Sequence, residues 1–398
     1  MADIPKQPRK FDAVLGGESQ IPVGAAILGG LEGVKQRFAN AVNEHQKAAA
    51  LKDAANYGRV GLEFLLQSLN SETQQVQKNL YLLLRHREES VVKQLLQNHH
   101  FWLLFECLTT LNSHSGYVLA VATSPDGKTA VSGSNDGTFK VWDLQARKLV
   151  ATLKKPSGAA VKCAAIAPSC QMVATGNRDQ TILVRNLQTG RELYAFTEKS
   201  ETIFALVFSP DGQHLASSSG DKTIKIWNLK TGECSWSLEG HLDVVYSMAI
   251  TPDGQYLVSG SKDKSIKIWN LKTGQEIRTL KGHSNIVFAV AVSPDGQMIA
   301  SGSSDETLKV WNFKTGKEIH TLNGHLFWVK SAVFGACGQI LISGSLDETI
   351  KVWNVKSGKL LTTLKGHLSP VECVAITPNG QTLISGSWDK TVKIWGIQ

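Results

Sequence analysis

The chain has 398 residues, of which 42% are hydrophobic and 19% charged. This is the balance of an ordinary soluble globular protein with room for one large core or two domains, and not of a membrane-embedded one. The formal charge of +8 does not by itself indicate nucleic-acid binding, because residues 1–104 hold 12 basic and 10 acidic residues and the rest of the excess is thinly spread. Much of it is one lysine per unit of a repeat described below, which we expect on a solvated face: Lys140, Lys225, Lys267, Lys309, Lys351 and Lys393.

Residues 1–30 are predicted to be a loop-like N-terminal segment. The apolar run at 21–31 is too short and too rich in glycine to span a membrane, and it is wrongly placed for a signal peptide. The glycine pairs of this segment lack the spacing of a phosphate-binding loop, so no nucleotide cofactor is expected. The cysteines show neither CxxC pairs nor metal-ligand spacing, which predicts buried reduced thiols, no metal and a cytoplasmic setting: Cys107, Cys163, Cys170, Cys234, Cys337 and Cys373.

Residues 31–100 are predicted to form a small all-α domain. Apolar residues recur there at three- and four-residue steps, in the sets Leu62, Leu65, Leu66 and Leu69, then Val76, Leu80, Leu83 and Leu84, then Val91, Val92, Leu95 and Leu96. Such stripes indicate amphipathic helices that must stack to bury them. The stretch 61–86 resembles a HEAT-type helical hairpin, over little more than one unit of that repeat.

A long repeat occupies residues 101–398, where the apolar period falls to two. A hydrophobic residue followed by tryptophan recurs at intervals of 43 and then 42 residues, with one arginine in the series: Trp142, Arg185, Trp227, Trp269, Trp311, Trp353 and Trp395. Turn signals such as the Pro-Asp-Gly at 210–212 punctuate each unit. Seven units of one length with several short strands each indicate radial repetition.

These units resemble the WD40-repeat family, on the Gly-His pairs at 240–241, 282–283, 324–325 and 366–367 and the literal Trp-Asp at 142–143. The near-identical units are similar to those of bacterial WD-repeat proteins. The resemblance implies an all-β seven-bladed propeller of four-stranded blades. It also implies that the early strand-like run at 105–112 supplies the fourth strand of the last blade, beside residues 391–396. Without that strand, two unpaired sheet edges would face solvent.

Five of the seven units carry His, Ser, Asp and Trp at fixed offsets, and in the WD40 family this set is a structural tetrad. The five complete sets are His114, Ser132, Asp136 and Trp142; His241, Ser259, Asp263 and Trp269; His283, Ser301, Asp305 and Trp311; His325, Ser343, Asp347 and Trp353; and His367, Ser385, Asp389 and Trp395. A chain of hydrogen bonds through them satisfies buried polar groups. Five near-identical copies argue against catalysis, since one reaction needs one distinctive site, so no catalytic residue is predicted.

Two units depart from this pattern. The third keeps Ser217, Asp221 and Trp227 but has Lys199 in place of the histidine. The second has Arg185 in place of its tryptophan, and Asp179 is the carboxylate we expect to pair with it. Either the second and third repeats have decayed and been compensated, or this side of the ring is altered for a partner.

The sequence favours a non-catalytic scaffold that binds a protein or peptide partner, with the helical domain as a second docking surface and the propeller itself monomeric. By the family resemblance, the channel-end rim that would bind the partner includes Tyr117, Phe204, Tyr246, Phe288, Trp328, Lys330 and Trp388, with Arg178 and Lys262 interspersed. We expect the three rings that lie 42 residues apart to be exposed, although the alternative is that they pack on neighbouring blades. A nucleic-acid-associated assembly factor and a propeller enzyme are the alternative functions.

Overall fold

The computed structural model describes residues 30–68, 73–84, 101–155, 157–198 and 202–397. They belong to two compact units, which divide between Leu104 and Phe105. The predicted stripe at residues 91–96, together with Leu69 and Lys199, lies outside the described residues.

The first unit is helical. It contains α1 (Gly30–Ala39), α2 (Glu44–Ala54), α3 (Gly58–Ser68), α4 (Gln74–Leu84) and the short 3₁₀ helix η1 (Phe101–Leu104). The predicted stripes of α3 and α4 point inward, because Leu65, Leu80 and Leu84 are fully buried. The side chain of Asn43 caps α2 by accepting a hydrogen bond from the backbone N–H of Gln46 at 2.9 Å. Within the described residues, no helix has the length and apolar character needed to cross a membrane.

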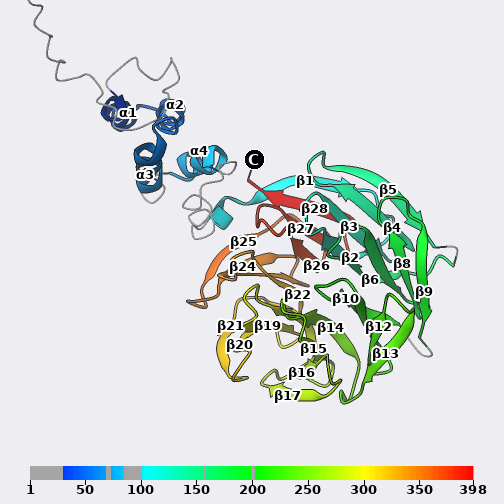
Figure 1. The fold of residues 1–398 in the computed structure, drawn as a ribbon. Helices are drawn as coiled ribbons and strands as arrows, with labels where there is room; N and C mark the ends of the chain where they lie inside the picture. The colour runs from blue at the N-terminus through cyan, green and yellow to red at the C-terminus, as the bar shows by residue number, and fades with distance from the viewer. Residues whose placement is uncertain (1–29, 69–72, 85–100, 156, 199–201, 398) are drawn as a thin grey trace, which may run out of the picture. The chain divides into compact units, whose positions relative to one another are not determined.

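The second unit is a seven-bladed β-propeller, as predicted, and each blade is a four-stranded antiparallel sheet (Figure 1). Blades 1 to 3 are β2 (Val118–Thr123), β3 (Thr129–Ser134), β4 (Thr138–Asp143) and β5 (Lys148–Lys154); β6 (Val161–Ile166), β7 (Met172–Asn177), β8 (Thr181–Asn186) and β9 (Glu192–Thr197); and β10 (Ile203–Phe208), β11 (His214–Ser219), β12 (Ile224–Asn228) and β13 (Glu233–Leu238). Blades 4 and 5 are β14 (Val245–Ile250), β15 (Tyr256–Ser261), β16 (Ser265–Asn270) and β17 (Glu276–Lys281); and β18 (Val287–Val292), β19 (Met298–Ser303), β20 (Leu308–Asn312) and β21 (Glu318–Leu322). Blades 6 and 7 are β22 (Val329–Phe334), β23 (Ile340–Ser345), β24 (Ile350–Asn354) and β25 (Leu360–Leu364); and β26 (Val371–Ile376), β27 (Leu383–Ser387), β28 (Thr391–Gly396) and β1 (Glu106–Asn112).

The core of the propeller lies between neighbouring blades. Leu308 and Val310 on β20 pack with Val329 and Leu341 of the next blade, and all four side chains are fully buried. The fit is close: a Cβ on Gly302 in β19 would lie 2.7 Å from Cγ1 of Val329. The Ser-Gly-Ser sequence of these strands therefore follows from the approach of one blade to the next.

The ring is closed by a strand from the start of the propeller. β1 pairs antiparallel with β28, with Cys107 opposite Trp395 and Asn112 opposite Thr391 (Figure 1). The ammonium group of Lys393 also donates a hydrogen bond to the hydroxyl of Thr110 at 2.6 Å. Blade 7 thus combines segments from the two ends of the propeller, and the pairing covers the edge that β28 would otherwise expose.

Candidate interaction site

Five blades contain the predicted chain of hydrogen bonds between tryptophan, serine, histidine and aspartate. In blade 5 the indole Nε1 of Trp311 donates to Oγ of Ser301 at 2.8 Å, and that hydroxyl lies 2.7 Å from Nε2 of His283. Nδ1 of His283 lies 2.8 Å from Oδ2 of Asp305. The same three contacts occur in blades 1, 4, 6 and 7. The histidine therefore donates to the carboxylate and accepts from the serine hydroxyl.

The charge state of these tetrads follows from burial and hydrogen bonding together. Burial alone would raise the pKa of Asp305, but hydrogen bonds from His283, the Thr307 hydroxyl and the Thr307 N–H outweigh it and hold the pKa well below its ordinary value. The other four tetrad aspartates behave alike. Burial lowers the pKa of His114 and His325 more than the neighbouring aspartates raise it, so these two imidazoles are neutral at pH 7.

Each tetrad aspartate also holds the loop that precedes its blade. Oδ2 of Asp347 accepts a hydrogen bond from the backbone N–H of Leu326 at 3.1 Å, and Asp389 and Asp263 bind the N–H of Leu368 and Leu242 in the same way. These three leucines are 73%, 83% and 79% exposed. The tetrads therefore fix the backbone of loops whose apolar side chains face solvent.

The second and third blades differ from what we expected. In blade 2, Asp179 does not pair with Arg185, because its carboxylate binds the ammonium group of Lys155 and the hydroxyls of Ser157 and Thr181. Lys155 lies two residues before the position that histidine occupies in the other units, and its ammonium group pairs with the carboxylate of Asp179 in place of Arg185. Arg185 nevertheless lies in the buried core position of the missing tryptophan.

In blade 3, Glu198 takes the part of the missing histidine. Oε1 of Glu198 accepts a hydrogen bond from Ser217 at 3.0 Å, and Ser217 in turn accepts one from Nε1 of Trp227 at 2.9 Å. The other carboxylate oxygen is paired with the ammonium group of Lys225. Glu198 is 2% exposed, so a carboxylate one residue before the expected position replaces the histidine, and Asp221 remains 3.6 Å from the ammonium group of Lys225.

The lysine that recurs in six of the seven units does not lie on a solvated face. Lys140, Lys267, Lys351 and Lys393 are at most 9% exposed, and their ammonium groups donate to threonine hydroxyls on the adjacent outer strand. Lys267 also pairs with Glu276 at 2.6 Å. Our expectation was wrong because these lysines lie on the third strand of the blade, where the aliphatic stem is covered by neighbouring strands.

The cysteines are all free, but they are less buried than expected. Cys163 is buried, and burial raises the pKa of its thiol to about 12. Cys107 and Cys234 are exposed on the outermost strands of their blades. Alternation along a strand does not tell an outer strand from an inner one, which accounts for the difference.

An arc of aromatic rings lines one end of the central channel. Phe204, Tyr246 and Phe288 occupy the same position on three consecutive innermost strands, and adjacent ring centroids lie 5.0 Å apart. Trp328 continues the arc, stacked at 5.5 Å on Phe288. Contrary to our expectation these three rings are not exposed: Phe288 is 8% exposed, and Phe204 and Tyr246 are half-buried. Each ring covers its neighbours, as in the alternative we had considered.

The other side of the channel end is polar and is joined to this arc. The ammonium group of Lys330 lies 3.8 Å from the centroid of Phe288 and 3.3 Å from Oε1 of Glu372. Glu372 also accepts a hydrogen bond from Nε1 of Trp388 at 3.1 Å, and Trp388 stacks on Tyr117 at 5.4 Å. A depression of about 320 Å³ is lined by Phe204, Tyr246 and Phe288 together with the charged residues Lys162, Lys330 and Glu372. Burial lowers the pKa of Lys162.

The exposed part of this end is formed by the loops around the arc. Tyr117 and Trp328 are 45% and 43% exposed, and Phe327 is 57% exposed. Leu326 and Leu368 are exposed on the corresponding loops, and we call these five apolar residues on the loops of blades 6, 7 and 1 the apolar crest. Sequence reasoning placed Tyr117 and Trp328 in the site and missed the other three. The available signal was the apolar residue directly after the Gly-His pairs at 324–325 and 366–367.

Nothing in the described residues points to a metal site: no group of three or more His, Cys, Asp or Glu side chains there is placed to hold an ion. The polar groups that do converge, the tetrads, are repeated and internally hydrogen-bonded. The side chains that line the channel end are aromatic, aliphatic and, in a few cases, charged.

The fold and the repeated tetrads define a WD40 propeller. The family model described as "WD domain, G-beta repeat" matches seven times, at residues 105–143, 147–186, 190–228, 232–270, 274–312, 316–354 and 358–396. The chain therefore belongs to the WD40 family.

Similarity to individual proteins is confined to short stretches. The small ribosomal subunit protein RACK1y of Oryza sativa is 38% identical over 80 residues, which are 20% of this chain and 23% of that protein. The pre-mRNA-splicing factor PRP46 of Eremothecium gossypii is 42% identical over 69 residues, 17% of this chain and 16% of that protein. A human NACHT domain- and WD repeat-containing protein is 34% identical over 93 residues, 22% of this chain and 6% of that protein. The chain thus spans less than a quarter of each of these relatives.

Proposed function

We propose that this protein is a non-catalytic interaction scaffold that binds a protein or peptide at the loop-bearing end of its propeller. The observation that carries the proposal is the apolar crest formed by Tyr117, Leu326, Phe327, Trp328 and Leu368. All five are large apolar side chains exposed on the loops at one end of the propeller, and such exposure is more typical of contact surfaces than of free protein surface.

Some residues of the site would contact the partner, and others would support the surface from below. Tyr117 and Trp328, which are exposed, would meet the partner, together with Leu326 and Phe327. The packed rings of Phe204, Tyr246 and Phe288 would hold the floor of the depression rigid, and Lys330 and Trp388 would offer polar edges for orientation. Because tetrad aspartates hold the crest loops, little conformational entropy would be lost on binding.

The helical region would be a second docking surface, with the character of a HEAT-type hairpin. Between α2 and α4 lies a groove of about 480 Å³, lined by alanines and leucines with His45 and Lys52 at its edge. An apolar groove between two helices is suited to an amphipathic helix of a partner. The scaffold would then carry two binding surfaces on one chain, in a cytoplasmic setting and with a monomeric propeller.

A role in a nucleic-acid assembly is the alternative, and it is favoured by two relatives, a small ribosomal subunit protein and a pre-mRNA-splicing factor. The burial of the repeated lysines weakens it, since Lys140, Lys267, Lys351 and Lys393 are not available to phosphates. Salt dependence separates the two: binding to phosphates weakens steeply with salt, whereas capture through an apolar crest does not. A propeller enzyme is the least supported reading.

Affinity capture with the full chain tests the proposal. The variant carries Leu326→Ser and Phe327→Ser, and the matched control carries Leu149→Ser and Val150→Ser, which are 43% and 64% exposed on the outer strand β5. We expect proteins retained by the wild type and the control to be lost from the crest variant, while thermal stability changes by no more than about 0.5 kcal/mol in either. Equal retention by all three proteins would refute the assignment of the crest.

A further inference from the structure

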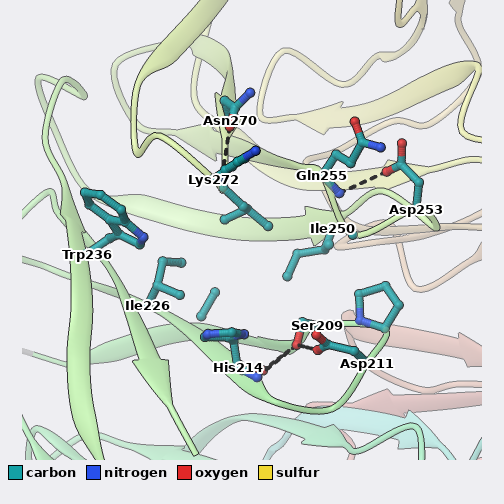
Figure 2. Close-up of a pocket in the computed structure, with 14 residues that line it drawn as sticks. Ser209, Asp211, His214, Ile226, Trp236, Ile250, Asp253, Gln255, Asn270 and Lys272 are labelled. Atoms are coloured by element: carbon teal, nitrogen blue, oxygen red, sulfur yellow. Dashed lines mark hydrogen bonds between the residues drawn. The ribbon is translucent and has the colours of Figure 1, made fainter.

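A groove of about 790 Å³ runs between blades 3 and 4, at the end of the strands opposite to the crest (Figure 2). It is bounded by the β10–β11 turn at 209–213, the β14–β15 turn at 253–255, and the β16–β17 turn at Lys272. The crest loops instead precede the innermost strands. Because consecutive strands are antiparallel, the two sets of connections lie at opposite ends of the blades.

The groove is open because the residues on its walls are smaller than those at the next blade interface. Between blades 4 and 5 the corresponding positions are Tyr256 and Phe313, whose ring centroids lie 5.4 Å apart and which close that gap. Between blades 3 and 4 they are His214 and Leu271, one repeat of 42 residues earlier in each case. The interface between blades 4 and 5 is therefore filled by two aromatic rings, whereas the equivalent interface between blades 3 and 4 is not.

The outer wall of the groove differs in the same way. Blade 4 has Arg278 at this position, and its guanidinium donates to the backbone carbonyls of Phe313 and Lys314 at 3.3 and 2.8 Å. Blade 3 has Trp236 instead, which covers Gly274 of the next blade: a Cβ there would lie 3.0 Å from Cε3 of Trp236. Trp236 remains 43% exposed and presents an aromatic surface to the groove (Figure 2).

The chemistry of the groove changes along its length. Its floor is apolar, with Ala216, Ile226 and Ile250 between the two ends (Figure 2). Away from Trp236 lie the carboxylates of Asp211 and Asp253, which each accept a backbone N–H on Oδ1, at 2.9 and 3.0 Å. These contacts anchor each carboxylate in its turn through one oxygen.

We propose that this groove binds a peptide segment in which an arginine side chain is flanked by apolar residues. The guanidinium would be bound by Asp211 and Asp253, and the apolar neighbours would cover Ile226, Ile250 and Trp236. A planar cation with several donors suits the carboxylates of these two neighbouring turns, and the apolar neighbours suit the isoleucines and the ring of Trp236. Lys272 and His214 also line the groove, and the two carboxylates outweigh the single permanent cation.

The test uses the full-length chain and a fluorescently labelled acetyl-Gly-Leu-Arg-Leu-Gly-amide peptide, with fluorescence anisotropy as the readout. The matched probe carries citrulline in place of arginine, which keeps the shape and removes the charge. We expect saturable binding of the arginine peptide and at least about tenfold weaker binding of the citrulline peptide. No saturable binding below about 1 mM, or equal binding of both peptides, overturns the proposal.

Variants then place the binding in the groove. The double variant His214→Tyr with Leu271→Phe installs the pair found at the next interface and should abolish binding. Asp211→Asn with Asp253→Asn should weaken it at least about tenfold. These turns should survive, because Asn379 already accepts the hydroxyl of Thr377 at 2.7 Å and the N–H of Gln381 at 3.0 Å in blade 7.

Two further variants serve as controls. Asp295→Asn changes the equivalent turn of blade 5 and should leave binding unchanged, as should the crest variant Leu326→Ser with Phe327→Ser. Binding that survives the filled groove, or that is weakened as much by Asp295→Asn as by the paired change, would place the site elsewhere and contradict the proposal.

Discussion

The backbone N–H of Leu326 donates to Oδ2 of Asp347 at 3.1 Å, and Nδ1 of His325 lies 2.7 Å from the same oxygen. One carboxylate oxygen therefore joins the buried tetrad to a loop whose leucine is 73% exposed. A feature that stabilises each blade also fixes the surface through which we propose that the protein binds a partner. The stability of the blade and the position of the exposed loop therefore depend on the same carboxylate, that of Asp347.

Removing a tetrad side chain should destabilise the propeller. Trp311→Ala removes a ring that is 2% exposed and leaves Ser301 without its donor, and Asp305→Ala leaves His283 without its acceptor. Each should lower the free energy of unfolding by about 2–5 kcal/mol, measured by urea denaturation. Arg185→Ala, at the same position in the adapted second blade, should cost less. A Trp311→Ala protein as stable as the parent would show that the tetrads are dispensable.

Closure by β1 should be required for a monomeric propeller. Deleting residues 1–104 leaves the strand Glu106–Asn112 in place beside β28, whereas deleting residues 1–112 exposes the edge of β28. The first protein should be monomeric by analytical ultracentrifugation, and the second should aggregate and melt at a lower temperature. Two truncations that behave alike would mean that this strand does not hold the ring together.

The closing strand and the tetrads could be predicted because each is repeated. Seven copies of one pattern show which features belong to the fold. The strand-like run before the first copy, β1, then has one place left to pair, beside β28 of the last blade. The exposed Leu326 and Leu368 could not be recognised in this way. A leucine follows three of the four Gly-His pairs, but this pattern does not show that the side chain is exposed, which depends on a hydrogen bond from the leucine N–H to an aspartate 21 positions further on.

The departures in blades 2 and 3 show where pattern reasoning fails. Alignment by offset put Lys199 in the histidine position, but the structure uses Glu198 with Lys225, so the polar partner shifted by one residue while the strand kept its register. Similarly, Asp179 was assigned to Arg185 by elimination, and Lys155 was the nearer cation. Whether Asp179 pairs with Arg185 or with Lys155 depends on backbone geometry, which the sequence spacing of these residues does not reveal.

The buried pair in blade 3 should be strongly coupled. Glu198 is 2% exposed, and Lys225 is its ionic partner. Glu198→Gln keeps a group that can bind Ser217 but leaves Lys225 with only the more distant carboxylate of Asp221, at 3.6 Å, so we expect it to cost more stability in the wild-type background than in a Lys225→Met background. The coupling energy from urea denaturation of the four proteins should be about 1–3 kcal/mol. Additive effects of the two changes would mean that the pair contributes no interaction energy.

Stability should fall as the pH falls, in two stages. Folding lowers the pKa of His114 and His325 from 6.5, so the unfolded chain binds protons first as the pH drops below about 6.5. Folding also lowers the pKa of the five tetrad aspartates from 3.8, so a second and steeper loss should begin near pH 4. Urea midpoints measured from pH 8 to pH 3 check this. A midpoint that rises on acidification would contradict the sign.

Hydrogen–deuterium exchange of the full chain with and without a purified partner tests the central claim most directly. The account predicts that the partner slows exchange in the loops at 113–117, 323–328 and 365–370, which carry Tyr117, the Leu326–Trp328 run and Leu368. It also predicts little change on the outer strands β5, β9 and β13. Protection confined to the helices α1 to α4 or to the outer strands, with the crest loops exchanging as in the free protein, would contradict it.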